Sequence, residues 1–321
     1  WNDAATWSIG EPDLIIKTPE ITVKANTPDW WGEIPRVPIP LTEDRYVVAV
    51  EVKEVNDLDS GGSGRQTVGG RYVFHHMIWG TRVVRGDEAA TEDDPTLALL
   101  AGGATPWPVH EVGRKADFFG TDSARLLQAG SSLVSDSVHL HSNGRDTKAH
   151  LEIGFKFAPK GFKPKFRRGP LGLGNGVDID IDANDPNQQL HAYAVLTDNT
   201  KILSFEPHLH APGKRMCLGA IWGYNIQTLN CVGYDHNWVR GYNYTDESAP
   251  LLPKGAILHI IGYMDNSPSN KNVPDPRNWQ GSGNRSVANM FIDLGNRVFL
   301  TDEQFQAEMA ARREKLKLTR N

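Results

Sequence analysis

The chain has 321 residues, of which 39% are apolar and 9% aromatic, and its net charge is −5. This length suits two domains of ordinary size, at roughly 150 residues each. The weak negative charge argues against a nucleic-acid partner or an anionic membrane surface. No apolar run approaches the ~20 residues that span a bilayer, so we expect no transmembrane segment.

Short apolar runs separated by Gly, Pro, Asn and Asp predict strands along most of the chain. They lie at residues 46–52, 72–79, 137–141, 149–157, 191–196, 216–221 and 256–263. Helical periodicity is clear only at residues 301–318, which are rich in helix formers and begin at a Thr301 or Asp302 cap. The pattern predicts an all-β chain with two consecutive jelly-roll-like β-sandwich domains and a short C-terminal helix.

The domain boundary is predicted from a change in composition. Residues 169–190 are Gly-rich and then acidic, which is typical of a solvated linker. We therefore expect an N-terminal domain over residues 1–168, a C-terminal domain over 191–300 and a helical end over 301–321.

The two cysteines, Cys217 and Cys231, are equidistant from Tyr224, which lies in a turn-like segment. In a hairpin centred there they would face each other, as a disulfide requires; the alternative is two buried free thiols. A disulfide favours an oxidising compartment. The chain begins at Trp1 without a Met, and we interpret it as a mature periplasmic or secreted chain after removal of a signal peptide.

Six of the eleven histidines fall in tight groups, and imidazole is a ligand for Cu, Zn, Fe and Ni. The groups are His75-His76, His139-Leu140-His141 and His208-Leu209-His210. Residues two apart on a strand point to one face, so each of the last two groups can aim both imidazoles together. The adjacent pair could do so only at a strand end or a bulge. Against this stands the simpler interpretation that the histidines are ordinary strand residues.

Sulfur ligands favour copper over the other metals. Carboxylates do not cluster beside these histidines as they do in zinc hydrolases. The thioether candidates are Met77, Met216, Met264 and Met290. A thioether combined with imidazoles selects Cu(I).

The chain resembles the copper type II, ascorbate-dependent monooxygenase family, whose animal members include peptidylglycine α-hydroxylating and dopamine β-monooxygenases. A bacterial branch of secreted proteins with the same motifs is the closer match. The resemblance covers most of the chain. Its motifs include FHHM (74–77), SVHLHS (137–142), FEPHLHAPGKRM (205–216), YDHNW (234–238), APLLPKGAILH (249–259) and GNRSVANM (283–290).

The resemblance implies two copper sites. The first would be held by His75 and His76 with His139 as third ligand, or His141 in its place. The second would be held by His208, His210 and Met290. Relatives carry two acidic residues before that methionine, where this chain has Ala288 and Asn289. Five histidines are left outside both sites: His110, His150, His191, His236 and His259.

The resemblance also implies the reaction. The His-His-Met site, which would be the catalytic one, activates dioxygen beside an organic C–H bond, and the three-histidine site delivers the second electron from a reductant. The expected partners are therefore a small organic substrate, dioxygen and a reductant. One alternative is a copper-binding, electron-transfer or structural subunit of a larger extracytoplasmic assembly. Another is a carbohydrate-binding β-sandwich, which leaves the histidine groups unexplained.

Overall fold

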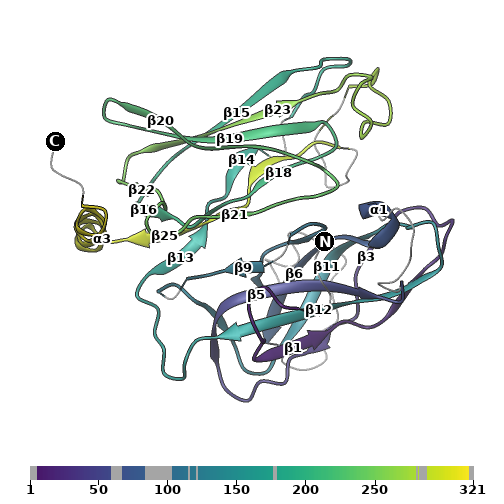
Figure 1. Cartoon of the computed structure of the whole chain (residues 1–321), viewed down its shortest axis with the longest axis horizontal. Helices are drawn as coiled ribbons and strands as arrows, with labels where there is room; N and C mark the ends of the chain where they lie inside the picture. The colour runs from purple at the N-terminus through teal and green to yellow at the C-terminus, as the bar shows by residue number, and fades with distance from the viewer. Residues whose placement is uncertain are drawn as a thin grey trace. The chain divides into compact units, whose positions relative to one another are not determined.

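The computed structural model describes residues 6–58, 67–83, 103–114, 116–120, 122–175, 179–279, 281 and 288–317. The chain divides into two compact units, Trp1–Pro164 and Lys165–Asn321. Figure 1 shows that antiparallel strands dominate both units. The prediction of an all-β sandwich fold is confirmed.

Two antiparallel sheets form the first unit. One has the order β1-β12-β5-β10, with β2 beside β12 and β9 beside β5. Its strands are β1 (Leu14–Lys17), β2 (Ile21–Val23), β5 (Arg45–Asn56), β9 (Ala116–Phe118), β10 (Arg125–Leu127) and β12 (Thr147–Phe157). The other has the order β3-β11-β6-β7, with β4 beside β11 and β8 beside β6. Its strands are β3 (Trp30–Gly32), β4 (Val37–Pro38), β6 (Phe74–Val83), β7 (Thr105–Pro106), β8 (His110–Glu111) and β11 (Ser131–Leu140).

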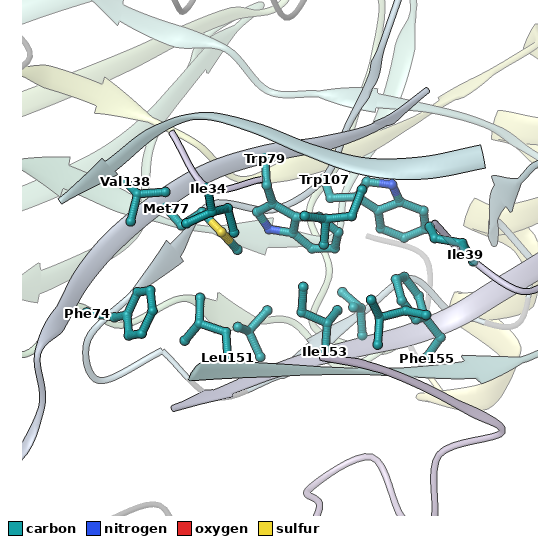
Figure 2. Close-up of a cluster of buried hydrophobic side chains, with 14 of the residues drawn as sticks. Ile34, Ile39, Phe74, Met77, Trp79, Trp107, Val138, Leu151, Ile153 and Phe155 are labelled. Carbon is teal, nitrogen blue, oxygen red and sulfur yellow. The ribbon is translucent and has the colours of Figure 1, made fainter. Parts of the chain in front are cut away.

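The core of the first unit lies between these two sheets. Alternate residues of β12 point inward, and Leu151, Ile153 and Phe155 are fully buried. Figure 2 shows them facing Trp79 and Met77, which come from the other sheet. The period-two pattern of the sequence therefore decides which side chains fill the sandwich.

The second unit contains four groups of strands. The largest sheet has the order β15-β23-β19-β20, and a second has the order β13-β25-β16-β22. Three further strands pair as β14-β24-β18, and β17 pairs with β21. The bounds are β13 (Arg167–Pro170), β14 (Leu173–Asn175), β15 (Gln188–Val195), β16 (Asn199–Ile202), β17 (Ser204–Phe205), β18 (Pro207–Leu209), β19 (Gly213–Trp222), β20 (Asn225–Gly233), β21 (Tyr242–Asn243), β22 (Leu251–Leu252), β23 (Ile257–Met264), β24 (Phe291–Asp293) and β25 (Asn296–Leu300).

In the described part of the chain, two helices accompany the strands. Helix α3 (Asp302–Lys315) begins as predicted at Thr301, whose side chain accepts a hydrogen bond from the backbone N–H of Gln304. The Gln304 side chain in turn accepts a hydrogen bond from the backbone N–H of Thr301. Helix α1 (Val68–Arg71) is a single turn directly before β6. Among the described residues, no helix has the length and hydropathy to cross a membrane.

The segment predicted as a linker is part of the second unit. It holds the end of β13, all of β14 and the start of β15. Ile179 and Ile181 lie in the core of that unit, while Asp180 and Asp182 between and after them are exposed. Within the acidic part of this segment, residues 179–182 thus alternate between a buried apolar side chain and an exposed acidic one.

The predicted hairpin is also present. Strands β19 and β20 pair with Cys217 directly opposite Cys231, and the two form a disulfide. Gly223 closes the turn with φ +54°, in the left-handed region that glycine tolerates. Free thiols at these positions are excluded.

Candidate metal centres

The first histidine cluster forms where β6 and β11 lie side by side. His76 on β6 is the register partner of His139 on β11. One ring nitrogen from each of His75, His76 and His139 lies within 4.8 Å of the other two. In the described part of the chain, these three form the only such group of histidine, cysteine or acidic ligands. An ion placed among them would therefore meet imidazole nitrogen and no carboxylate.

A β-bulge allows two adjacent histidines to reach the same place. The β6–β11 register shifts between His139, which pairs with His76, and Leu140, which pairs with Phe74. His75 is the additional residue of the bulge. In a regular strand, neighbouring side chains point to opposite faces, whereas a bulge redirects one of them. The expectation that this doublet needs a bulge or a strand end is confirmed.

The ring of His139 is held on two sides. Its Nε2 lies 2.9 Å from Oδ2 of Asp29, and its face stacks on Trp31 with ring centroids 4.0 Å apart and planes 7° apart. Its Nδ1 is buried and has no hydrogen-bond partner among the described residues. Asp29 thus occupies one nitrogen and leaves the other for an ion, which is how carboxylates commonly orient metal-binding histidines. Burial lowers the pKa of His139, although Asp29 opposes this shift. The lowered pKa favours the neutral ring, which is the form that binds metals.

His141 borders this cluster without belonging to its compact core. Its ring centroid is 5.8 Å from that of His75 and 6.4 Å from that of His139. Burial lowers its pKa as well. Of the two candidates for the third position, the geometry therefore places His139 in the group with the doublet and His141 beside it.

The backbone before the doublet is anchored by a buried carboxyl group. Glu54 on β5 accepts hydrogen bonds from the backbone N–H groups of Val73 and Phe74, at 3.0 and 2.8 Å. Burial raises the pKa of Glu54 to about 7. Glu54 also lines a cavity of about 220 Å³, whose other lining residues include Arg71, His110 and Arg114. The hydrogen bonds from Val73 and Phe74 to Glu54 join the strand that carries His75 to the opposite sheet.

The second histidine cluster lies at the end of β18. The rings of His208 and His210 have centroids 5.2 Å apart and planes 75° apart. Strand β18 pairs with β24, where His208 faces Ile292 and Leu209 faces Phe291. His210 directly follows Leu209 and Met290 directly precedes Phe291, so both residues lie at the same end of this strand pair. The half-buried Met290 is thus brought next to the pair from a segment far away in the sequence.

His210 is oriented by the segment that precedes Met290. Its Nδ1 lies 3.2 Å from the backbone oxygen of Ala288. A carbonyl oxygen only accepts, so Nδ1 carries the proton and Nε2 is the nitrogen suited to an ion. Because this contact uses the backbone, it does not depend on the Ala288 side chain. Asn289 is fully buried, and its backbone N–H donates to Gly281.

Sequence reasoning missed three residues at the two clusters. Asp29 and Trp31 hold His139, and His236 lies beside His210 with ring centroids 6.3 Å apart. The sequence-based assignment leaves His236 outside both copper sites. The only available signal was its place in a polar turn directly after a strand. Asp29 lies 110 residues from His139, and no local pattern connects them.

The other candidate sulfur ligands belong to the hydrophobic cores. Met77 is fully buried in the first unit, and Met216 and Met264 are buried in the second. His110 is buried on β8, where desolvation lowers its pKa to about 4. Neither the buried methionines nor His110 join a histidine cluster.

Comparisons with known proteins leave the family open. No family model matches the chain, and no curated protein matches it. Among solved structures, it is similar to one titled "Structure of infectious bursal disease virus Gx strain", with TM-score 0.22 and 9% identity over 92% of this chain and 74% of that one. A T=3 Penaeus vannamei nodavirus structure gives TM-score 0.18 and 8% identity over 91% and 92%. Similarity this weak supports no argument about function.

Proposed function

We propose that this chain binds copper at two centres and hydroxylates an organic C–H bond with dioxygen and an external reductant. The observation that carries the proposal is that two groups of histidines form compact clusters, one of them at the end of a strand pair that also carries Met290. In the first, the ligand atoms of His75, His76 and His139 lie within 4.8 Å of one another. In the second, His210 and Met290 lie next to the last pair of the β18–β24 register, Leu209 and Phe291.

The donor atoms favour copper over zinc. The first group offers imidazole nitrogens alone, and neutral imidazoles bind Cu(II) more tightly than other divalent first-row metals. The second offers two imidazoles and a thioether, which is a soft ligand that selects Cu(I). A site with two strong ligands and one weak one also leaves coordination positions open, as a catalytic site requires.

The roles of the two sites follow from the resemblance to the copper type II monooxygenase family. His208, His210 and Met290 would hold the copper at which dioxygen is activated beside the substrate. His75, His76 and His139 would hold the copper that delivers an electron. The overall reaction combines R–H and dioxygen with two electrons and two protons to give R–OH and water. Bound copper would supply the one-electron redox chemistry that amino-acid side chains here lack.

In each proposed site, a hydrogen bond to a group outside the ligand set fixes the ring of one histidine. Asp29 fixes the ring of His139, and the backbone oxygen of Ala288 fixes that of His210. Contacts of this kind set the tautomer and the orientation of ligating histidines. Rings held in this way need little reorientation to bind a metal ion.

A second candidate function is copper binding or electron transfer without hydroxylation, alone or as a subunit of a larger assembly. Two observations favour it. Ala288 and Asn289 stand where the related family has acidic residues, and His236 lies close enough to His210 to compete with Met290 as a ligand. A third imidazole would change an open site into a closed one.

We also infer an extracytoplasmic location, in the periplasm or outside the cell. The support is the disulfide between Cys217 and Cys231, since disulfides persist mainly in oxidising compartments.

The test combines metal content with oxygen uptake. Copper-loaded wild type should hold two tightly bound coppers, and His75→Ala and His208→Ala should each lose a different one. With ascorbate as reductant, a glycine-extended peptide or dopamine should then increase oxygen consumption and appear as a hydroxylated product. Oxygen uptake that no substrate stimulates would favour the non-catalytic function. Preference for zinc in direct competition would exclude the copper assignment.

A further inference from the structure

A third histidine pair lies on the exposed face of the large sheet in the second unit, on strands that carry none of the histidines described above. Strands β15 and β23 pair over eight consecutive residues without a bulge. The side chains of Leu258 and Ile260 on β23 are buried, and that of His259 between them points to the outer face. His191 on β15 is exposed on the same face.

The two imidazoles meet through single nitrogen atoms. Nδ1 of His191 lies 2.9 Å from Nε2 of His259. Their ring centroids are 5.1 Å apart and their planes differ by 18°, so the rings lie nearly edge to edge. Tyr193 stacks on His259 with centroids 4.2 Å apart and planes 9° apart. The aromatic contact restrains His259 and leaves the outer side of the pair open to water.

We propose that His191 and His259 form a surface chelate for a divalent transition metal, with Cu(II) preferred. A metal–nitrogen bond of about 2.0 Å and a 90° angle place two ligand nitrogens about 2.8 Å apart, against about 3.3 Å for a tetrahedral angle. The observed 2.9 Å separation matches the 90° geometry. Tetragonal nitrogen sites of that kind are typical of Cu(II) and Ni(II).

Binding at this pair requires a small rearrangement that both rings can make. In the hydrogen bond, the nitrogens point toward each other, whereas a chelated metal lies to one side of the line between them. Each ring must therefore turn about its Cβ–Cγ bond, which is a soft torsion. The proton shared by the two nitrogens moves through water to the other nitrogen of its own ring. Two neutral imidazoles thus bind the metal without net proton release.

The surroundings suit a weak, accessible site more than a catalytic one. The register partner of His191 is Ile261 and that of His259 is Tyr193, so the neighbouring strand positions offer no second pair of ligands. Water would fill the remaining coordination positions. The pair lies on regular strands, however, and a rigid backbone lowers the entropy cost of chelation.

The experiment is a Cu(II) titration of metal-free, tag-free protein, comparing wild type with His191→Gln and His259→Gln. Each variant should bind one Cu(II) ion fewer than wild type. If it binds the same number, its most weakly bound Cu(II) should bind at least about 10-fold less tightly than the corresponding ion of wild type. The double variant should lose no more than either single one. Electron paramagnetic resonance of the last equivalent in wild type should show coupling to two nitrogens. This difference of one metal is independent of how many ions the other two centres bind.

Tyr193→Phe is the matched control, because it keeps the stacked ring and removes only the hydroxyl. It should bind the same number of Cu(II) ions as wild type. The proposal is overturned if wild type and His191→Gln bind equal amounts of Cu(II) with equal affinity. A variant that loses stability and no metal would show instead that the pair is only a cross-strand hydrogen bond.

Discussion

Nε2 of His139 lies 2.9 Å from Oδ2 of Asp29, a residue 110 positions earlier in the chain. The contact joins a buried ring to an exposed carboxylate on the segment leading into β3. Because burial lowers the pKa of His139, the contact is a hydrogen bond to a neutral ring and not an ion pair. The net contribution of such a hydrogen bond to folding is about 1 kcal/mol, so we expect it to act mainly on the orientation of His139.

Replacing this carboxylate should weaken metal binding at the first cluster. For Asp29→Ala we expect copper affinity there to fall about 10- to 100-fold, the usual effect of losing a carboxylate behind a ligating histidine. The free energy of unfolding of the metal-free protein should change by no more than about 1 kcal/mol. Competition with a chelator of known affinity measures the first quantity, and urea denaturation the second.

Asp146→Ala is the matched control for Asp29→Ala. The two side chains are similarly exposed, at 59% for Asp146 and 60% for Asp29, but Asp146 forms an ion pair with Lys24 and does not contact a histidine of the cluster. The control should leave copper affinity unchanged. Equal losses in the two variants would mean that Asp29 has no particular role at the cluster.

The buried Glu54 makes stability depend on pH. Its pKa is about 7 in the folded protein, against an ordinary value of 4.5. Because the folded state holds this proton more tightly, the stabilisation is complete below pH 4.5 and is lost as the pH rises through about 7. The loss should be on the order of 3 kcal/mol between these limits.

Glu54→Gln should remove this pH dependence. The amide oxygen can still accept from Val73 and Phe74 but does not ionise. Urea denaturation of metal-free wild type and variant at pH 5 and pH 7.5 measures the difference. The variant should gain relative stability at the higher pH. Parallel pH profiles for the two proteins would contradict the assignment of this titration to Glu54.

Met290 should matter to Cu(I) binding more than to folding. Met290→Leu conserves volume, and such replacements usually cost under ~1.5 kcal/mol. Cu(I) affinity at the second cluster should fall at least about 10-fold, because the soft sulfur ligand is lost. The control is Met216→Leu, which alters a fully buried core methionine and should leave Cu(I) affinity unchanged.

His236→Gln distinguishes between the two candidate third ligands. If Met290 is the ligand, this variant should bind Cu(I) as wild type does. If His236→Gln loses affinity and Met290→Leu does not, the second cluster is a three-histidine site. That result would favour the electron-transfer function over hydroxylation.

The disulfide should contribute strongly to the stability of the second unit. It joins residues separated by 14 positions, and a loop of this size corresponds to about 3 kcal/mol. The Cys217→Ser, Cys231→Ser double variant should be destabilised by about that amount. In native wild type, neither cysteine should react with an alkylating reagent until a reductant is added. Alkylation without reductant would contradict the pairing.

Local features of this protein were predictable from the sequence because the information lies within a few residues. The alternating pattern along 149–157 determines which side chains of β12 face the core. The Thr301 side chain caps α3 through a residue three positions away. The spacing of Cys217 and Cys231 about a turn predicts their hairpin, in which a register shift between Leu218 and Gly219 brings the two cysteines opposite each other. In each case, strand or helix periodicity converts spacing directly into geometry.

Only the tertiary structure decided how the histidine groups are completed. The bulge at His75 depends on how β6 and β11 pair, and the contact of Asp29 with His139 depends on β3 pairing with β11. His236 approaches His210, and His191 meets His259, through chain segments that no short-range pattern connects. Strand register is set by the whole sandwich packing its apolar face. Sequence could therefore name the metal-binding candidates, while their third ligands and supporting contacts required the fold.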